Sequence, residues 1–136
     1  MNTSPTSAAS TTAKTRVLCV DDNVDLTSVL ESMISADRAF ECIGCLNSAW
    51  RLADDVCAFQ PLPDVMILDT SMPGLDVFAV VRELVFRTPG LRIVIYSGHD
   101  DSVFKAQANA AGAFACVSKP DEPAKLLRAI HKAAAR

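Results

Sequence analysis

Four short apolar runs in this chain each lead into a polar or charged residue. Residues 17–20 lead into Asp21-Asp22, residues 65–68 into Asp69, and residues 93–96 into Ser97. A fourth run, residues 114–117, is followed after one serine by Lys119. Continuous apolar runs of this length indicate strands buried on both faces, as in a parallel sheet. The pattern therefore predicts polar side chains at the carboxyl ends of buried strands.

Helical patterns separate these runs, so strand and helix alternate along the chain. We expect strands at residues 16–20, 40–46, 64–69, 92–97 and 113–118. We expect helices from a cap at Asp22 or Asn23 to Ile34, at residues 48–59, at residues 75–87, from Asp101 or Ser102 to a terminal Gly112, and from Pro123 onward. Strict alternation predicts an α/β fold, a doubly wound five-stranded parallel sheet with five helices. In such sheets ligands bind beyond the carboxyl ends of the strands.

Length and charge restrict the class of protein. The chain has 136 residues, the size of one domain, and 50% of them are apolar. A net charge of −3 gives no sign of nucleic-acid binding, and no apolar run is long enough to insert in a membrane. Residues 1–15 are rich in Ser, Thr and Ala, and they predict a disordered N-terminal tail before one domain at residues 16–136.

The five cysteines form an odd set in a chain with a large core, which favours a reducing compartment. Cys42 and Cys45 form a CxxC motif that could be half of a zinc site or a redox pair. No second CxxC or histidine cluster completes a metal site, and this motif lies in a predicted strand instead of opening a helix. The interpretation we favour is that these cysteines are small buried apolar residues.

The strand-end residues suggest one acidic pocket. Three carboxylates, those of Asp21, Asp22 and Asp69, repel one another when they are brought together. A hard divalent cation such as Mg²⁺ suits oxygen ligands of this kind. Lys119 could pair with an anion brought to the metal, and a phosphoryl group fits that description. Each residue alone could be a helix cap or a turn residue; their joint occurrence at one sheet edge favours a site.

At these residues the chain resembles the receiver domain of bacterial two-component response regulators, the CheY-like domains. The resemblance covers about residues 16–134, and the matching residues are Asp21-Asp22-Asn23, Asp69 with Met72-Pro73-Gly74, Ser97-Gly98, Gly112-Ala113 and Lys119-Pro120. It implies a flavodoxin-like receiver fold and a phosphoprotein of the two-component type.

The resemblance also implies a role for each site residue. Asp69 would be the phosphoacceptor, and Asp22, Asp69 and the backbone carbonyl of Ser71 would ligate Mg²⁺, for which Mn²⁺ is an acceptable substitute. Asp21 would hold metal-bound water. Lys119 and Ser97 would contact the phosphoryl oxygens. Phosphoryl transfer depends more on positioning and charge neutralisation than on covalent chemistry, which agrees with this residue set.

The implied function is that of a cytoplasmic single-domain response regulator. A sensor histidine kinase or a histidine phosphotransfer protein would supply the phosphoryl group, and a separate protein would be the downstream target. The chain would catalyse only its own phosphorylation and dephosphorylation. One departure concerns signalling: Cys116 stands three residues before the lysine, where the family often has Tyr or Phe.

Two other functions are compatible with parts of the sequence. A Mg²⁺-dependent aspartyl-phosphate hydrolase usually has a second Asp two residues after the nucleophile, and here Ser71 has that place. A receiver-like binding module that acts without phosphorylation is compatible with Cys116, although the intact acidic pocket speaks against it.

Trp50 and His99 are not expected to bind a ligand or a metal. Trp50 is expected to pack as part of the second helix, and His99 to be a solvated loop residue.

Overall fold

The structure is a computed structural model that describes residues 13–99, 101–119 and 123–135. Of the predicted tail, residues 1–12 lie outside these ranges, and the first strand already begins at Thr15. Pro120 of the Lys119-Pro120 motif also lies outside them. The predicted disorder of the tail and its boundary with the domain therefore stay predictions.

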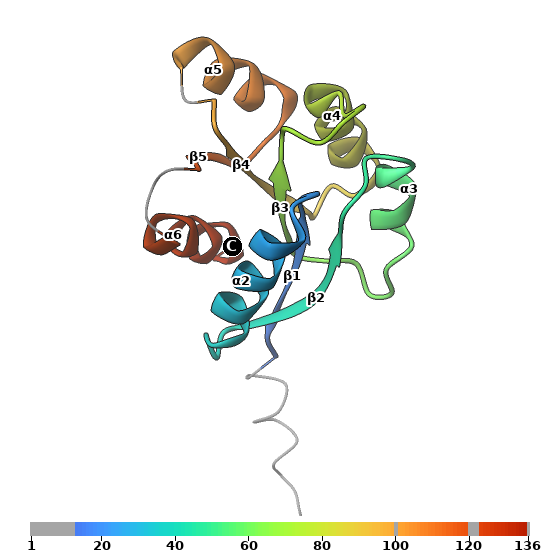
Figure 1. Ribbon diagram of the computed structural model, residues 1–136. Helices are drawn as coiled ribbons and strands as arrows, with labels where there is room; N and C mark the ends of the chain where they lie inside the picture. Colours follow the sequence, from blue (N-terminus) through green and yellow to red (C-terminus); the bar gives the residue numbers. More distant parts are fainter. Residues whose placement is uncertain (1–12, 100, 120–122, 136) are drawn as a thin grey trace, which may run out of the picture.

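The sheet has five parallel strands in the order β2-β1-β3-β4-β5, which confirms the predicted fold class (Figure 1). The strands are β1 (Thr15–Val20), β2 (Phe40–Leu46), β3 (Val65–Asp69), β4 (Arg92–Ser97) and β5 (Ala115–Ser118). The third strand begins at Val65, one residue later than expected, and the Asp64 side chain just before it accepts a hydrogen bond from the Arg16 backbone at 2.9 Å.

The described residues contain five helices, one after each strand. They are α2 (Val24–Ser35), α3 (Leu52–Cys57), α4 (Val77–Arg87), α5 (Ser102–Ala111) and α6 (Pro123–Ala134). Asn23, Asp76 and Asp101 cap three of these helices, each with a side-chain oxygen that accepts a backbone N–H in the first turn. Gly112 ends α5 with a φ of 112°, as predicted.

The helices cover both faces of the sheet, and alternate residues of each strand point to opposite faces. In β1, Val17 and Cys19 join the core that is closed by α2 and α6. Leu18 and Val20 join the core under α3, α4 and α5. Both faces of the central strands are therefore buried, and their carboxyl ends lie together at one edge of the sheet.

The second helix is much shorter than the predicted range of residues 48–59. Arg51 adopts a left-handed conformation with φ 55°, which ends any helix that starts before it. A turn precedes it, in which the Trp50 backbone donates to the Ser48 hydroxyl at 3.1 Å. Trp50 is 79% exposed and precedes α3, so the prediction that it packs as part of the second helix is wrong.

Candidate functional site

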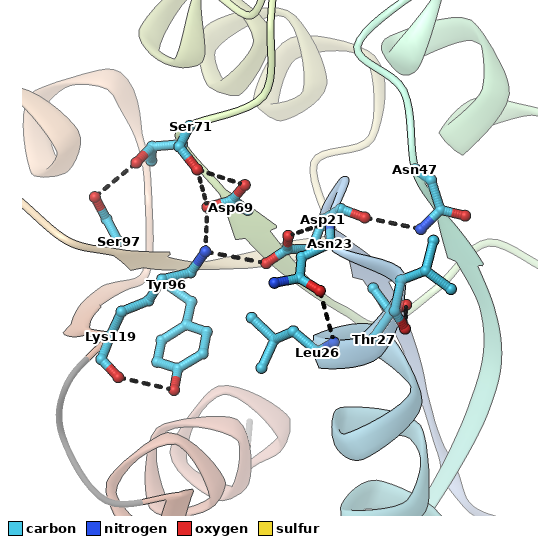
Figure 2. A network of polar contacts seen from close by, with 12 residues as sticks. Asp21, Asn23, Leu26, Thr27, Asn47, Asp69, Ser71, Tyr96, Ser97 and Lys119 are labelled. Carbon is cyan, nitrogen blue, oxygen red and sulfur yellow. Dashed lines mark hydrogen bonds and ion pairs between the residues drawn. The ribbon is translucent and has the colours of Figure 1, made fainter.

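The predicted residues meet at the carboxyl edge of the sheet. Asp21 follows β1, Asp69 ends β3, Ser97 ends β4 and Lys119 follows β5 (Figure 2). Because β1, β3, β4 and β5 are successive neighbours in the sheet, strand ends that are far apart in sequence come together. Asp21, Asp69 and Ser97 are each at most 2% exposed.

Lys119 joins the two buried carboxylates. Its Nζ lies 2.7 Å from Asp69 Oδ1 and 3.2 Å from Asp21 Oδ2. Burial acts to lower the pKa of Lys119, but hydrogen bonds and charges from Asp69 and Asp21 outweigh it and raise the pKa. Two backbone contacts fix the segment, because Lys119 N donates to the Ser97 carbonyl at 2.8 Å and the Tyr96 hydroxyl donates to the Lys119 carbonyl at 3.2 Å.

Asp69 has a second partner, the side-chain hydroxyl of Ser71, which was not predicted from the sequence. The Ser71 hydroxyl lies 3.1 Å and 3.0 Å from the two carboxylate oxygens of Asp69. Ser71 was expected to contribute its backbone carbonyl. In the structure its side chain also contacts Asp69 and orients the buried carboxylate.

The Ser97 hydroxyl has two partners of its own. It lies 2.6 Å from the Thr70 hydroxyl and accepts a hydrogen bond from the His99 backbone at 3.0 Å. Thr70 was not identified from the sequence, although its place directly after Asp69 was a signal. His99 is exposed as predicted, and its ring stacks on Phe104 with centroids 5.1 Å apart. The hydroxyl that would reach a phosphoryl group is thus tied to the loop after β4.

The acidic residues fit a hard divalent cation. One carboxylate oxygen from each of Asp21, Asp22 and Asp69 lies within 4.8 Å of the others. Asp21 Oδ2 is buried and accepts no hydrogen bond, although the Lys119 ammonium lies nearby. Lys119 supplies one positive charge for two buried carboxylates, which leaves negative charge at the cluster for a divalent cation to neutralise. The Asn23 backbone donates to the other oxygen, Asp21 Oδ1, at 2.9 Å and holds the carboxylate in place.

This arrangement can bind a dianionic group and accept it. The Asp69 oxygens are candidate nucleophiles, and Lys119 with a cation at the acidic cluster would neutralise charge on an incoming phosphoryl group. Asn47 stabilises the segment after β1, since its side-chain amide donates to the Asp21 carbonyl at 2.8 Å. Sequence reasoning missed Asn47, because nothing in its local pattern sets it apart from a turn residue.

Comparison with known families decides the class of this domain. The response regulator receiver domain family matches residues 17–131. The chain belongs to this family. It is accordingly a receiver domain, the phosphoacceptor module of two-component signalling, and the resemblance read from its motifs is confirmed.

The curated relatives are longer than this chain. A protein-glutamate methylesterase/protein-glutamine glutaminase from Myxococcus xanthus is 34% identical over 106 residues, which cover 77% of this chain. The chain spans only 25% to 30% of the length of the curated relatives it matches first. Among the described residues, no helix is both long and apolar enough to cross a membrane.

Solved structures agree on the fold. A LuxR-family two-component response regulator from Aurantimonas superposes with a TM-score of 0.82 at 24% identity, covering 90% of this chain and 86% of that one. A CheX–CheY–BeF3–Mg²⁺ complex from Borrelia burgdorferi also gives a TM-score of 0.82, at 21% identity over 94% of this chain and 95% of that one.

Proposed function

We propose that this receiver domain, residues 16–136, accepts a phosphoryl group on Asp69 with Mg²⁺ bound at Asp21, Asp22, Asp69 and the Ser71 backbone carbonyl. The observation that carries the proposal is the contact of 2.7 Å between the Lys119 ammonium and a carboxylate that is only 1% exposed. A cation in contact with a buried carboxylate is the arrangement that a phosphoacceptor needs.

The chain's own residues would carry out the transfer. An Asp69 oxygen forms the bond to phosphorus while the bond between phosphorus and the donor's histidine nitrogen breaks, and the nitrogen takes a proton from water. Lys119 moves its contact from the carboxylate to a phosphoryl oxygen, and the Ser97 hydroxyl donates to another. The Mg²⁺ ion supplies charge neutralisation on the phosphoryl oxygens.

We infer a cytoplasmic signalling role with separate protein partners. The donor would be a sensor histidine kinase or a phosphotransfer protein, and the output would be binding to another protein. The α5–β5–α6 face supports such binding, because it holds a cavity of about 330 Å³ lined by Lys105, Phe114, Cys116, Lys125, Arg128 and Lys132. This cationic lining favours an acidic partner surface. The similar Borrelia protein was solved with CheX as its partner.

The experiment is phosphorylation by acetyl phosphate, followed by intact-mass spectrometry. Wild-type protein should gain one phosphate in Mg²⁺ or Mn²⁺ and none in chelator. Asp69→Asn should gain none, while Asp55→Asn, an exposed aspartate of α3, should be labelled like wild type. Labelling of Asp69→Asn would contradict the assignment of the phosphoacceptor.

A second candidate function is a receiver-like module that binds its partner without phosphorylation. It is favoured by one observation, the thiol of Cys116 in place of an aromatic ring on β5. Binding to a captured partner with and without beryllofluoride, a phosphoryl mimic, separates the two functions. Affinity that does not change with beryllofluoride would favour the phosphate-independent module.

A further inference from the structure

Three thiols come together on the face of the sheet that is covered by α2. Cys19 lies on β1, and Cys42 and Cys45 lie on the neighbouring edge strand β2. Cys19 pairs in register with Cys45, and the three sulfur atoms all lie within 4.8 Å of one another. A third cysteine, from the neighbouring strand β1, thus joins the two cysteines of the CxxC motif.

A bulge in β2 makes this convergence possible. Residues three apart in a regular strand point to opposite faces, so Cys42 and Cys45 should be separated by the sheet. The pairing instead skips one residue, since Val17 pairs with Cys42 and Leu18 pairs with Gly44. The extra residue, Ile43, restores both thiols to one face. Both cysteines accordingly pack with the core under α2 and α6, whereas Ile43 packs on the opposite side.

The three residues Cys19, Cys42 and Cys45, here called the thiol cluster, differ in their exposure to solvent. Cys19 is fully buried, while Cys42 and Cys45 are half-buried. Burial is the main cause that raises the pKa of Cys45, to about 11, and the charge of Glu31, an exposed residue of α2, contributes to that rise and also opposes the ionisation of Cys42. A hydrogen bond from the Cys19 thiol has the larger effect on Cys42 and lowers its pKa to about 7. A cation could therefore enter from the Glu31 side and meet sulfur ligands.

We propose that this thiol cluster binds a soft, thiophilic cation of the Zn²⁺ class. Tetrahedral Zn²⁺ with Zn–S bonds of ~2.3 Å has its sulfurs about 3.8 Å apart, so three sulfurs within 4.8 Å need only small side-chain rotations to close on the ion. The fourth position would be taken by water or by the Glu31 carboxylate. Binding releases the thiol protons to solvent, and no oxidant is needed.

Ligand type separates this site from the acidic one. Thiolates select soft cations, whereas carboxylates and carbonyls suit Mg²⁺. Cys57 and Cys116 are half-buried like Cys42 and Cys45 but are absent from the cluster, so the chain supplies its own control cysteines. The proposal is independent of phosphorylation at Asp69.

The test uses the full chain, reduced, in excess Mg²⁺ so that the acidic site is occupied. Co²⁺ is the spectroscopic probe, because a thiolate-to-cobalt charge-transfer band reports sulfur ligation directly. Zn²⁺ should displace the Co²⁺ at one ion per chain, and competition with a chromophoric chelator gives its affinity. Cys42→Ser and Cys45→Ser should weaken Zn²⁺ binding by at least about tenfold and diminish the band, while Cys57→Ser and Cys116→Ser should match wild type.

The outcomes are decisive because the ligand variants change half-buried residues and can be checked for native circular dichroism. Absence of the charge-transfer band in reduced wild-type protein would overturn the proposal. An unchanged Zn²⁺ affinity in both Cys42→Ser and Cys45→Ser would also overturn it, as would an equal loss in the two control variants.

Discussion

The acidic site and the thiol cluster each include a residue from β1 or its end, and these residues, Asp21 and Cys19, are two positions apart in the sequence. The two sites nevertheless arise in different ways. Asp21 leaves β1 at its carboxyl end and meets residues from other strand ends. Cys19 lies within β1 and meets two residues of one neighbouring strand. The acidic site thus follows from sheet topology, which any chain with this strand order shares. The thiol cluster follows from one irregularity in one pair of strands.

Charge distinguishes the two regions as clearly as their origin does. At the acidic site three carboxylates lie close together and one ammonium contacts two of them, which leaves an excess of negative charge. At the thiol cluster the pKa of Cys42 is lowered to about 7, so this thiol is partly ionised near neutral pH, whereas the pKa of Cys45 is raised to about 11 and its thiol keeps its proton until a cation or a base removes it. The first region should therefore respond to any hard divalent cation, and the second only to a soft one. The two sites can therefore bind different cations without competing for the same ion.

The largest expected effect is the loss of the Mg²⁺ response in Asp69→Ala. Mg²⁺ at 100 times its Kd should stabilise the wild-type protein by about 2.7 kcal/mol by mass action, seen as a higher Tm. Asp69→Ala removes a ligand and should abolish most of that shift, while it stabilises the metal-free protein by relieving carboxylate repulsion. The Tm response to Zn²⁺ measured in excess Mg²⁺ should be unchanged. A full Mg²⁺ response in the variant would show that the acidic cluster is not the metal site.

Lys119→Met should have a smaller effect, and in the opposite direction for the metal-free protein. The variant keeps the aliphatic stem but leaves the buried carboxylates of Asp21 and Asp69 without their cation. Loss of the charged hydrogen bond to Asp69 and of the ion pair with Asp21 should lower the free energy of unfolding by about 1–3 kcal/mol in urea titrations without metal. Mg²⁺ should restore part of the loss.

Lys105→Met, an exposed lysine of α5, is the matched control for this substitution and should match wild type. If Lys119→Met were as stable as wild type without metal, Lys119 would not be neutralising the acidic site.

A change in loop response is the next expected effect. The Ser97 hydroxyl contacts Thr70 and the His99 backbone, so its movement toward a phosphoryl group should shift the loop after β4. Ser97→Ala should reduce the chemical-shift response of His99 to beryllofluoride. Cys116→Ala should leave it nearly unchanged, because this small side chain cannot fill the space as a ring would. The reverse order of effects would show that β5 carries the coupling.

Much of the acidic site could be predicted from the sequence because its determinants are local. An apolar run followed by Asp marks a strand end, and the topology of an alternating fold brings such ends together. Side-chain contacts within the site could not be predicted, as with the Ser71 hydroxyl on Asp69 and Thr70 on Ser97. These depend on rotamers and on the register of strands that are distant in sequence.

Cys19, Cys42 and Cys45 pack in the core as expected, but their convergence on one face of the sheet could not be predicted from the sequence. The sequence showed Cys42 and Cys45 in a strand, where regular alternation puts them on opposite faces. Gly44 is a weak local signal of the bulge at Ile43, and the meeting with Cys19 appears only in the pairing of β1 with β2. Trp50 is a similar case, since the left-handed Arg51 that shortens α3 is not a glycine or asparagine that would have indicated it.

The smallest expected effect is that of Gly44→Ala, which tests whether the bulge needs a glycine. A Cβ on Gly44 would lie 3.5 Å from the Phe59 ring, an ordinary van der Waals contact, and the residue does not have a positive φ. The free energy of unfolding should change by less than about 1 kcal/mol, and the Zn²⁺ affinity should stay as in wild type. Gly112→Ala is the contrasting substitution, because its φ is positive and its Cβ would lie 2.7 Å from a Val85 methyl; it should cost clearly more. Loss of Zn²⁺ binding in a folded Gly44→Ala protein would mean that the bulge, and with it the thiol cluster, depends on glycine at this position.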